Sequence, residues 1–252
     1  MRALPEIIKQ IIIINALFFL GTFLINPNIT SFANDLLALH FPKNDLFGIW
    51  QIITHMFMHG STMHILFNMF GLWMFGSPLA QMWGRNKFLF FYLSAGLGAS
   101  ILQLLVNYYQ VSSIIEQLVN SGFSESSITD LLQSQRYNTA WQSVITEIEL
   151  KKLYTSFNFS MVGASGALYG VLVAFAFLFP NAELMLLFLP IPIKAKYFVP
   201  GVVILDSISA LTGQSFFSPS NTAFIAHIGG AITGFIMMWY WKQNQFNKNR
   251  WN

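Results

Sequence analysis

The amino-acid sequence predicts an all-α membrane protein that crosses the bilayer several times. Hydrophobic residues make up 54% of its 252 residues and charged residues only 9%, well below the roughly one quarter typical of soluble domains. Its 26 phenylalanines and 7 tryptophans suit a lipid-facing surface with aromatic anchors at the two membrane edges. The chain has no cysteine, which excludes disulfides and thiolate metal sites.

Six apolar stretches are candidates for membrane-spanning helices. About 20 helical residues, rising about 1.5 Å each, cross a hydrocarbon layer of about 30 Å. We expect the spans near residues 7–25, 61–83, 88–108, 161–179, 197–211 and 223–241. Residues 1–252 then form one membrane domain, whose first span is retained rather than removed as a signal peptide.

Three segments between the spans have patterns of their own. Residues 26–60 mix polar breaks with apolar residues at helical spacing, which predicts a long, partly amphipathic first loop in the membrane interface. Residues 111–158 hold five of the ten acidic residues yet keep a helical pattern, which predicts two or three short extramembrane helices between spans 3 and 4. Within them, Ser127 and Asp130 have the spacing of a helix-capping box. Residues 184–193, broken by two prolines, are expected to form a re-entrant or interfacial loop.

The basic residues predict an orientation. Six spans put both termini on one side, and if that side is cytoplasmic, nine basic residues lie inside and four outside, as the positive-inside rule requires. The inside set is Arg2, Lys9, Arg85, Lys87, Lys194, Lys196, Lys242, Lys248 and Arg250; the outside set is Lys43, Arg136, Lys151 and Lys152. We expect both termini to be cytoplasmic, in a bacterial inner membrane. No basic patch points to nucleic acid.

This orientation brings three polar positions to one depth. Spans 2, 4 and 6 run in the same direction, and His64, Ser165 and His227 lie near their starts. Polar side chains at membrane depth are costly and by default mark functional sites. A hydroxyl, an imidazole and a further polar pair suggest a nucleophile, a base and oxyanion donors.

Ser165 is the candidate nucleophile. It stands between Gly163 and Gly166 at an expected helix start, where free backbone N–H groups favour negative charge. Serine needs a base, and His227 is the only histidine in the second half of the chain. Asp206 could complete a Ser-His-Asp triad, but its position near the end of span 5 favours an interfacial cap.

Small residues predict that the helices of the serine and the histidine pack closely. Gly230 and Gly234, four residues apart, would let one helix approach the other at Gly166 and Gly170. Tyr169 lies one turn after Ser165 on the same face and could orient the imidazole; a plain packing role remains open.

His64 and Asn68 are the candidate oxyanion donors. Four residues apart, they project from one helix face, and both side chains can donate a hydrogen bond. A role as polar contacts between two helices is the alternative. His55 and His59 have a metal-like spacing, but no carboxylate lies nearby in sequence, so structural hydrogen bonds are favoured.

These motifs resemble those of the rhomboid intramembrane serine proteases. The resemblance rests on Gly163-Ala164-Ser165-Gly166, on His64 with Asn68, on Ala226-His227 with Gly230 and Gly234, and on Trp50 fourteen residues before His64, and it covers about residues 45–110 and 160–240. It implies a six-helix fold and a Ser165–His227 dyad without an acidic member. It also implies that Tyr169 packs on His227, and that the Ser165 backbone N–H, His64 and Asn68 form an oxyanion hole.

The resemblance further implies the partners, and the chain departs from the family pattern at Gln51 and in residues 111–158, which are longer than the minimal family loop and whose role is open. Substrates of such proteases are transmembrane proteins cut near the outer membrane face, and neither a cofactor nor a metal is implied. Gln51 stands where the family often has arginine, so the anchoring of the first loop is an open question.

We therefore expect a site-specific intramembrane serine endopeptidase embedded in the lipid bilayer. One alternative is a catalytically silent rhomboid-like protein that binds membrane clients; the presence of both Ser165 and His227 argues against it. The other is a transporter or channel, but the sequence shows neither a pair of half-helix repeats nor a series of charged residues within the membrane.

Overall fold

A computed structural model describes residues 4–23, 27–186, 189–212 and 223–248. Its helices are α1 (Glu6–Phe23), α2 (Pro27–Leu37), α3 (Gln51–Thr54), α4 (Thr62–Gly71), α5 (Ser77–Trp83), α6 (Arg85–Asn120), α7 (Glu125–Gln133), α8 (Glu147–Phe157), α9 (Ser165–Leu178), α10 (Ala195–Thr212) and α11 (Phe224–Lys248). Four short strands, β1 (Leu39–His40), β2 (Ser160–Met161), β3 (Glu183–Leu186) and β4 (Leu189–Lys194), form two antiparallel pairs.

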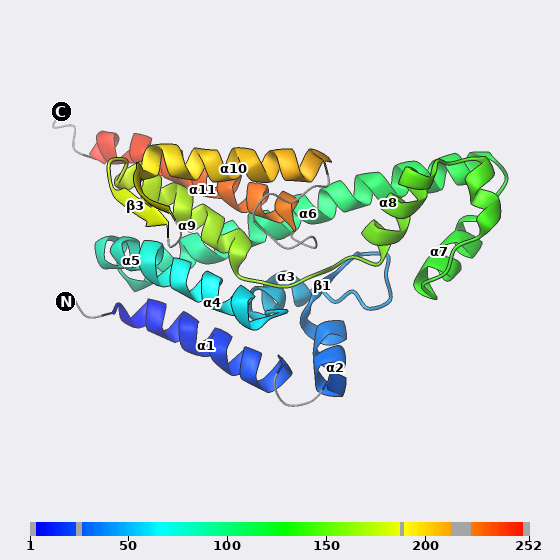
Figure 1. The fold of residues 1–252 in the computed structure, drawn as a ribbon, viewed down its shortest axis with the longest axis horizontal. Helices are drawn as coiled ribbons and strands as arrows, with labels where there is room; N and C mark the ends of the chain where they lie inside the picture. The colour runs from blue at the N-terminus through cyan, green and yellow to red at the C-terminus, as the bar shows by residue number, and fades with distance from the viewer. Residues whose placement is uncertain (1–3, 24–26, 187–188, 213–222, 249–252) are drawn as a thin grey trace.

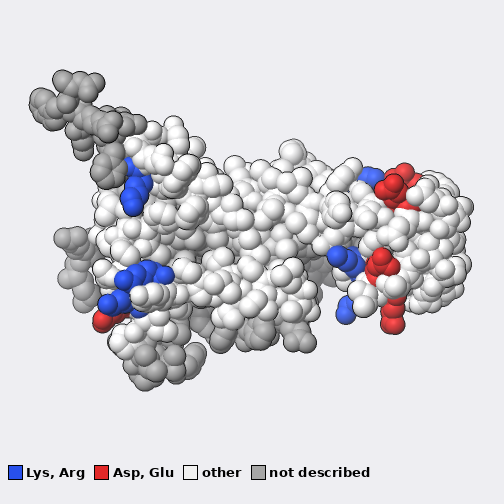
Figure 2. Space-filling view, turned by 90° about the horizontal axis from the view of Figure 1, so that it is seen from above, with Lys and Arg blue, Asp and Glu red and all other residues white. Residues whose placement is uncertain are grey.

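Helices occupy all six segments predicted to span. Three of the described helices are long and apolar enough to cross a membrane: Arg85–Asn120, Ala195–Thr212 and Phe224–Asn244. The helices α4, α9 and α11 start at the same end of the bundle, whereas α6 and α10 run in the opposite direction (Figure 1). Charged side chains gather at the two ends of the face shown in Figure 2 and leave an uncharged band between them, as a chain embedded in lipid requires.

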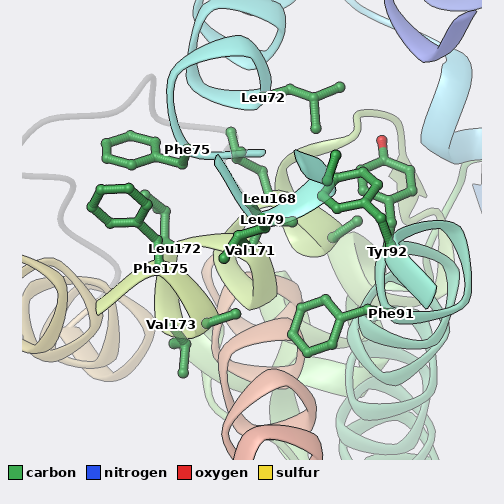
Figure 3. Close-up of a cluster of buried hydrophobic side chains, with 14 of the residues drawn as sticks. Leu72, Phe75, Leu79, Phe91, Tyr92, Leu168, Val171, Leu172, Val173 and Phe175 are labelled. Atoms are coloured by element: carbon green, nitrogen blue, oxygen red, sulfur yellow. The ribbon is translucent and has the colours of Figure 1, made fainter. Parts of the chain in front are cut away.

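The central helix is α9. Its side chains are buried in nearly every direction, which is typical of a helix enclosed by others. Leu168, Val171 and Phe175 pack in one cluster with Phe75 and with Phe91 of α6 (Figure 3). This enclosure fixes the helix that begins with Ser165.

The second predicted span is not a regular helix. A π-helical turn, Leu72–Gly76, separates α4 from α5. Pro78 stands in the first turn of α5 and lacks the N–H that would bond back to residue 74, which accounts for the break in the ladder. Ser61 caps the start of α4 by accepting a hydrogen bond from the His64 backbone N–H.

The segment 111–158 is helical, as predicted, but it begins inside α6. At about 1.5 Å per residue, the 36 residues of α6 extend about 54 Å, well beyond a hydrocarbon layer of about 30 Å. The protruding end packs with α7, α8 and the 3₁₀ turn Thr139–Ser143 around a separate apolar cluster. Phe41 of the first loop belongs to this cluster, so loop and insertion form one unit.

The predicted capping box is wrong. Because α7 begins at Glu125, both Ser127 and Asp130 lie inside the helix. The capping box observed is at α8, where Thr146 and Glu149 exchange hydrogen bonds. The bond from the Thr146 backbone N–H lowers the pKa of the Glu149 carboxyl.

Residues 184–186 and 189–193, in the segment expected to be a re-entrant or interfacial loop, belong to two paired strands, and their place relative to the membrane stays a prediction. Strand β3 pairs with β4 in the register Glu183↔Lys194 and Leu184↔Ile193. The prolines that suggested a loop are tolerated because each strand of a two-stranded sheet has a free edge.

Gln51 anchors the first loop. Its side chain is fully buried, and its Nε2 donates to the backbone carbonyls of Leu46 at 2.7 Å and Asp35 at 3.1 Å. Its Oε1 accepts from the His40 backbone N–H at 3.2 Å. The neutral amide is thus satisfied by three backbone groups. Next to it, β1 pairs with β2, so the loop is joined to the segment that leads into α9.

We predict that Trp141→Ala destabilises the cluster of the insertion without disturbing the bundle. Trp141 is 1% exposed, and removing a buried tryptophan typically costs about 3–5 kcal/mol. Hydrogen exchange in detergent should accelerate in α7 and α8 but not in α9 or α11. Ile148→Ala, at a position 79% exposed in α8, is the matched control and should change nothing. Equal exchange in wild type and Trp141→Ala would contradict the prediction.

Candidate active site

Ser165 and His227 lie in hydrogen-bond contact. Ser165 is the first residue of α9, and His227 is in the first turn of α11. The distance from His227 Nε2 to Ser165 Oγ is 2.8 Å, and His227 is only 6% exposed. A serine hydroxyl bonded to a buried imidazole is the arrangement that nucleophilic catalysis needs.

Asp206 is not an interfacial cap, because its carboxylate lies against His227 and gives the expected dyad an acidic neighbour. Its Oδ2 lies 2.7 Å from His227 Nδ1, and the residue is 7% exposed. The expected span ended at residue 211 and α10 ends at Thr212, so the position of Asp206 in the helix was predicted correctly. The sequence did not show that its carboxylate faces His227 of α11. The geometry is therefore that of a serine, a histidine and an aspartate in series.

Two aromatic rings confine the imidazole. The Tyr169 ring is stacked on His227 with centroids 4.2 Å apart and planes at 15°. Phe224 meets the imidazole edge-on at 6.5 Å. The Tyr169 hydroxyl is also within electrostatic reach of Asp206. Phe224 escaped the sequence analysis because an aromatic at a helix start carries no distinguishing signal.

Glycines set the spacing of the two helices. A Cβ built on Gly230 would collide with the Gly166 carbonyl, and one on Gly234 would lie 2.7 Å from Gly170 Cα. On its other side α11 touches α6, where a Cβ on Gly229 would lie 2.8 Å from the Gly98 carbonyl oxygen. The backbones themselves are in contact, so no side chain fits between them.

His64 and Asn68 lie beside the turn that precedes Ser165. Gly163 has a φ of +126°, which favours glycine, and a Cβ there would lie 2.7 Å from His64 Nε2 and 3.7 Å from Asn68 Nδ2. The Gly163 N–H donates to the His55 carbonyl at 2.9 Å. The structure thus brings together the polar pair of α4 and the start of α9.

His55 and His59 both make hydrogen bonds in the structure. His55 Nδ1 lies 2.8 Å from the Gln51 carbonyl, and its Nε2 lies 3.3 Å from Ser100 Oγ. His59 Nε2 lies 3.0 Å from Asn68 Nδ2. Within the described ranges, no three histidine or acidic side chains form a metal-binding group. The role of Ser100 was missed, because a single serine in an apolar helix is not distinctive.

We predict that Gly230→Ala destabilises the bundle. The added methyl group would meet the Gly166 backbone, which cannot rotate away as a side chain does, and overpacking typically costs about 1–3 kcal/mol. The apparent Tm in detergent should fall. Gly201→Ala in α10 is the matched control, because nothing lies within 4 Å of a Cβ there. Equal Tm values for the two variants would show that the close packing is unimportant.

The sequence of this chain is similar to those of known proteins. A family model described as "Rhomboid domain" matches residues 47–244. "Rhomboid protein 1, mitochondrial" of Saccharomyces cerevisiae is 25% identical over 190 residues, which are 75% of this chain and 41% of that protein. "Presenilin-associated rhomboid-like protein, mitochondrial" of Homo sapiens is 25% identical over 185 residues, 73% of this chain and 35% of that protein.

An "Uncharacterized rhomboid protein" of Schizosaccharomyces pombe, also mitochondrial by its name, is 26% identical over 208 residues. The match covers 77% of this chain and 52% of that protein. The chain thus spans about a third to a half of these relatives. Their names say mitochondrial, so they lend no support to the predicted bacterial inner membrane. Because the family model covers most of its length, the chain belongs to the rhomboid family.

Proposed function

We propose that this chain is an intramembrane serine endopeptidase that cleaves transmembrane helices near one end of the bundle. The observation that carries the proposal is the 2.8 Å contact between Ser165 Oγ and His227 Nε2, buried at the start of α9 in a rhomboid-family chain. A protein that only binds membrane clients has no need of this hydrogen bond at membrane depth.

The two steps follow from the contacts. Ser165 Oγ attacks the scissile carbonyl while His227 Nε2 accepts its proton, and the imidazolium then donates that proton to the leaving amine. A water molecule, deprotonated by His227, hydrolyses the resulting acyl-enzyme and restores Ser165. Asp206, 2.7 Å from Nδ1, keeps the proton on that nitrogen and stabilises the imidazolium while it exists.

The oxyanion formed in each step needs donors. The Ser165 backbone N–H belongs to the first turn of α9, whose amides have no partner within the helix. His64 and Asn68 approach the same turn at Gly163 and supply two further donors. No metal or cofactor enters these steps.

The depth of the site follows from the length of α9. Its 14 residues, rising about 1.5 Å each, extend about 21 Å, short of a hydrocarbon layer of about 30 Å. If its C-terminal end reaches one surface, Ser165 lies below the other, and water enters from that side because the bilayer core holds none. In the six-span arrangement that we propose, both termini lie opposite this side.

The insertion stands on the same side as the proposed site. Strand β2 connects α8 with the turn before Ser165, and β1 joins it to the first loop (Figure 1). A salt bridge of 3.1 Å between Lys43 and Glu125 adds a second tie between loop and insertion. We propose that residues 111–158 influence substrate entry or stability and take no part in the chemistry.

We predict that Ser165→Ala and His227→Ala each abolish cleavage of a model transmembrane substrate while the protein stays folded. Nucleophile and base act as a unit, so the double variant should be no worse than either single one. Labelling by a serine-reactive phosphonate should be lost in Ser165→Ala, which also separates a protease from a silent client-binding protein. Substantial turnover by a folded Ser165→Ala variant would refute the proposal.

We predict that Asp206→Asn lowers kcat strongly. In chymotrypsin-type proteases the corresponding change costs about 10⁴-fold, because the imidazole is held in the wrong tautomer. Ser209→Ala, another buried position of α10, is the control and should keep most of the activity. A nearly unchanged kcat in Asp206→Asn would restore the dyad without an acidic member.

We predict that Asn68→Ala lowers kcat by about 10²–10³-fold, the usual cost of one oxyanion donor. KM should change little, because the hydrogen bond strengthens only as charge develops. Chelator treatment of the wild type in parallel tests the alternative in which His55, His59 and His64 hold a metal. Chelator-sensitive activity, or an effect of Asn68→Ala on KM alone, would overturn the assignment.

A further inference from the structure

His59 is a buried imidazole that the mechanism above leaves unused. It lies between the 3₁₀ turn His55–Phe57 and α4 and is 3% exposed. Its Nε2 is 3.0 Å from Asn68 Nδ2, and its ring meets the His64 ring edge-on with centroids 5.0 Å apart and planes at 69°. A single side chain therefore contacts both groups that we assign to the oxyanion.

The contact with Asn68 determines the hydrogen-bonding state of His59. An amide nitrogen only donates hydrogen bonds, so His59 Nε2 must accept. The imidazole is then neutral, with its proton on Nδ1. In this form Nε2 holds one of the two hydrogens of the Asn68 amino group.

The second hydrogen remains available on the side of the proposed site. The same Asn68 Nδ2 lies 3.7 Å from a Cβ built on Gly163, two residues before Ser165. If the amide were rotated by 180°, its carbonyl oxygen would face both His59 Nε2 and the oxyanion. The first contact would then need the other tautomer of His59, with the proton on Nε2, and the second contact would be repulsive. With Nδ2 on this side, Asn68 can donate one hydrogen to His59 and the other to the oxyanion.

We infer that His59 is a positioning residue that keeps the amino group of Asn68 directed at the oxyanion. The inference rests on the proposed function, because it gives His59 a part only in a reaction that forms an oxyanion. His59 itself touches neither substrate nor reacting atoms. Its effect passes through Asn68 and should vanish when that side chain is absent.

The test compares two amide substitutions at one position. His59→Gln reaches about as far as Nε2 and can accept from Asn68 through its carbonyl oxygen. His59→Asn is one methylene shorter and cannot reach, but it has the same polar group and serves as the matched control. Each is made in the wild type and in Asn68→Ala, and kcat and KM are measured with the full chain in detergent on a transmembrane substrate.

We expect His59→Asn to lower kcat by about 10- to 100-fold, and by no more than the complete loss of one oxyanion donor would. The KM of His59→Asn should stay within about twofold of the wild-type value. His59→Gln should stay within about threefold of wild type, because an acceptor is kept at the same place. In the Asn68→Ala background both variants should change kcat by less than about twofold, since contacting residues that act through one another are not additive.

Three results would overturn the inference: an unchanged kcat in folded His59→Asn, a loss of equal size in both backgrounds, or a folded His59→Gln as impaired as His59→Asn. Thermal unfolding measurements show whether each variant is folded. If His59→Asn does not fold, His59→Gln decides alone: activity near wild type supports the inference, and activity as low as that of Asn68→Ala refutes it. Cleavage by Ser165→Ala would refute the proposed function instead, so the two failures are distinguishable.

Discussion

The contact between the backbones of α9 and α11 is the constraint on which the site depends. Ser165 and His227 stand on different helices, so their 2.8 Å separation is set by the distance between two helix axes. With glycine facing glycine, that distance is as short as the main chains allow. A displacement of about 1 Å can cost about 100-fold in rate. The packing of glycines is thus part of the catalytic geometry that we propose.

The second constraint is that every polar group at this depth needs a partner. Three hydrogen-bonded chains meet at the turn before Ser165. One runs from Asp206 through His227 to the serine hydroxyl. Another joins His59 to Asn68, and the third ties the Gly163 N–H to the His55 carbonyl. These chains hold the elements that carry them in one arrangement, although His59 Nδ1 is buried without a hydrogen-bond partner among the described residues.

The order of helices and the meeting of the polar residues could be predicted from the sequence. Hydropathy located the helices, and the alternation of direction predicted His64, Ser165 and His227 at one end. In the structure the helices that begin near these residues, α4, α9 and α11, start at the same end of the bundle (Figure 1). Glycines at four-residue spacing indicated the close approach of two helices. Such predictions rest on periodicity and chain direction, which are properties of the sequence itself.

The details that failed depend on contacts between distant segments. The capping spacing of Ser127 and Asp130 is equally compatible with the interior of a helix, and only the start of α7 at Glu125 decides between them. The anchoring by Gln51 was open because its partners are backbone groups of the residues before it, which no side-chain pattern reveals.

Asp206 shows the limit most clearly, and its chemistry suggests why the chain would contain it. Near the end of an apolar run, an aspartate is compatible with either a solvated cap or a buried partner. The structure buries it, and a buried carboxylate is costly even beside an imidazole, because desolvation offsets much of the attraction. That attraction is greatest when the imidazole is positively charged, which in the mechanism that we propose is when His227 has taken the proton of Ser165. On that proposal, the contact acts mainly in the transition state rather than in the resting fold.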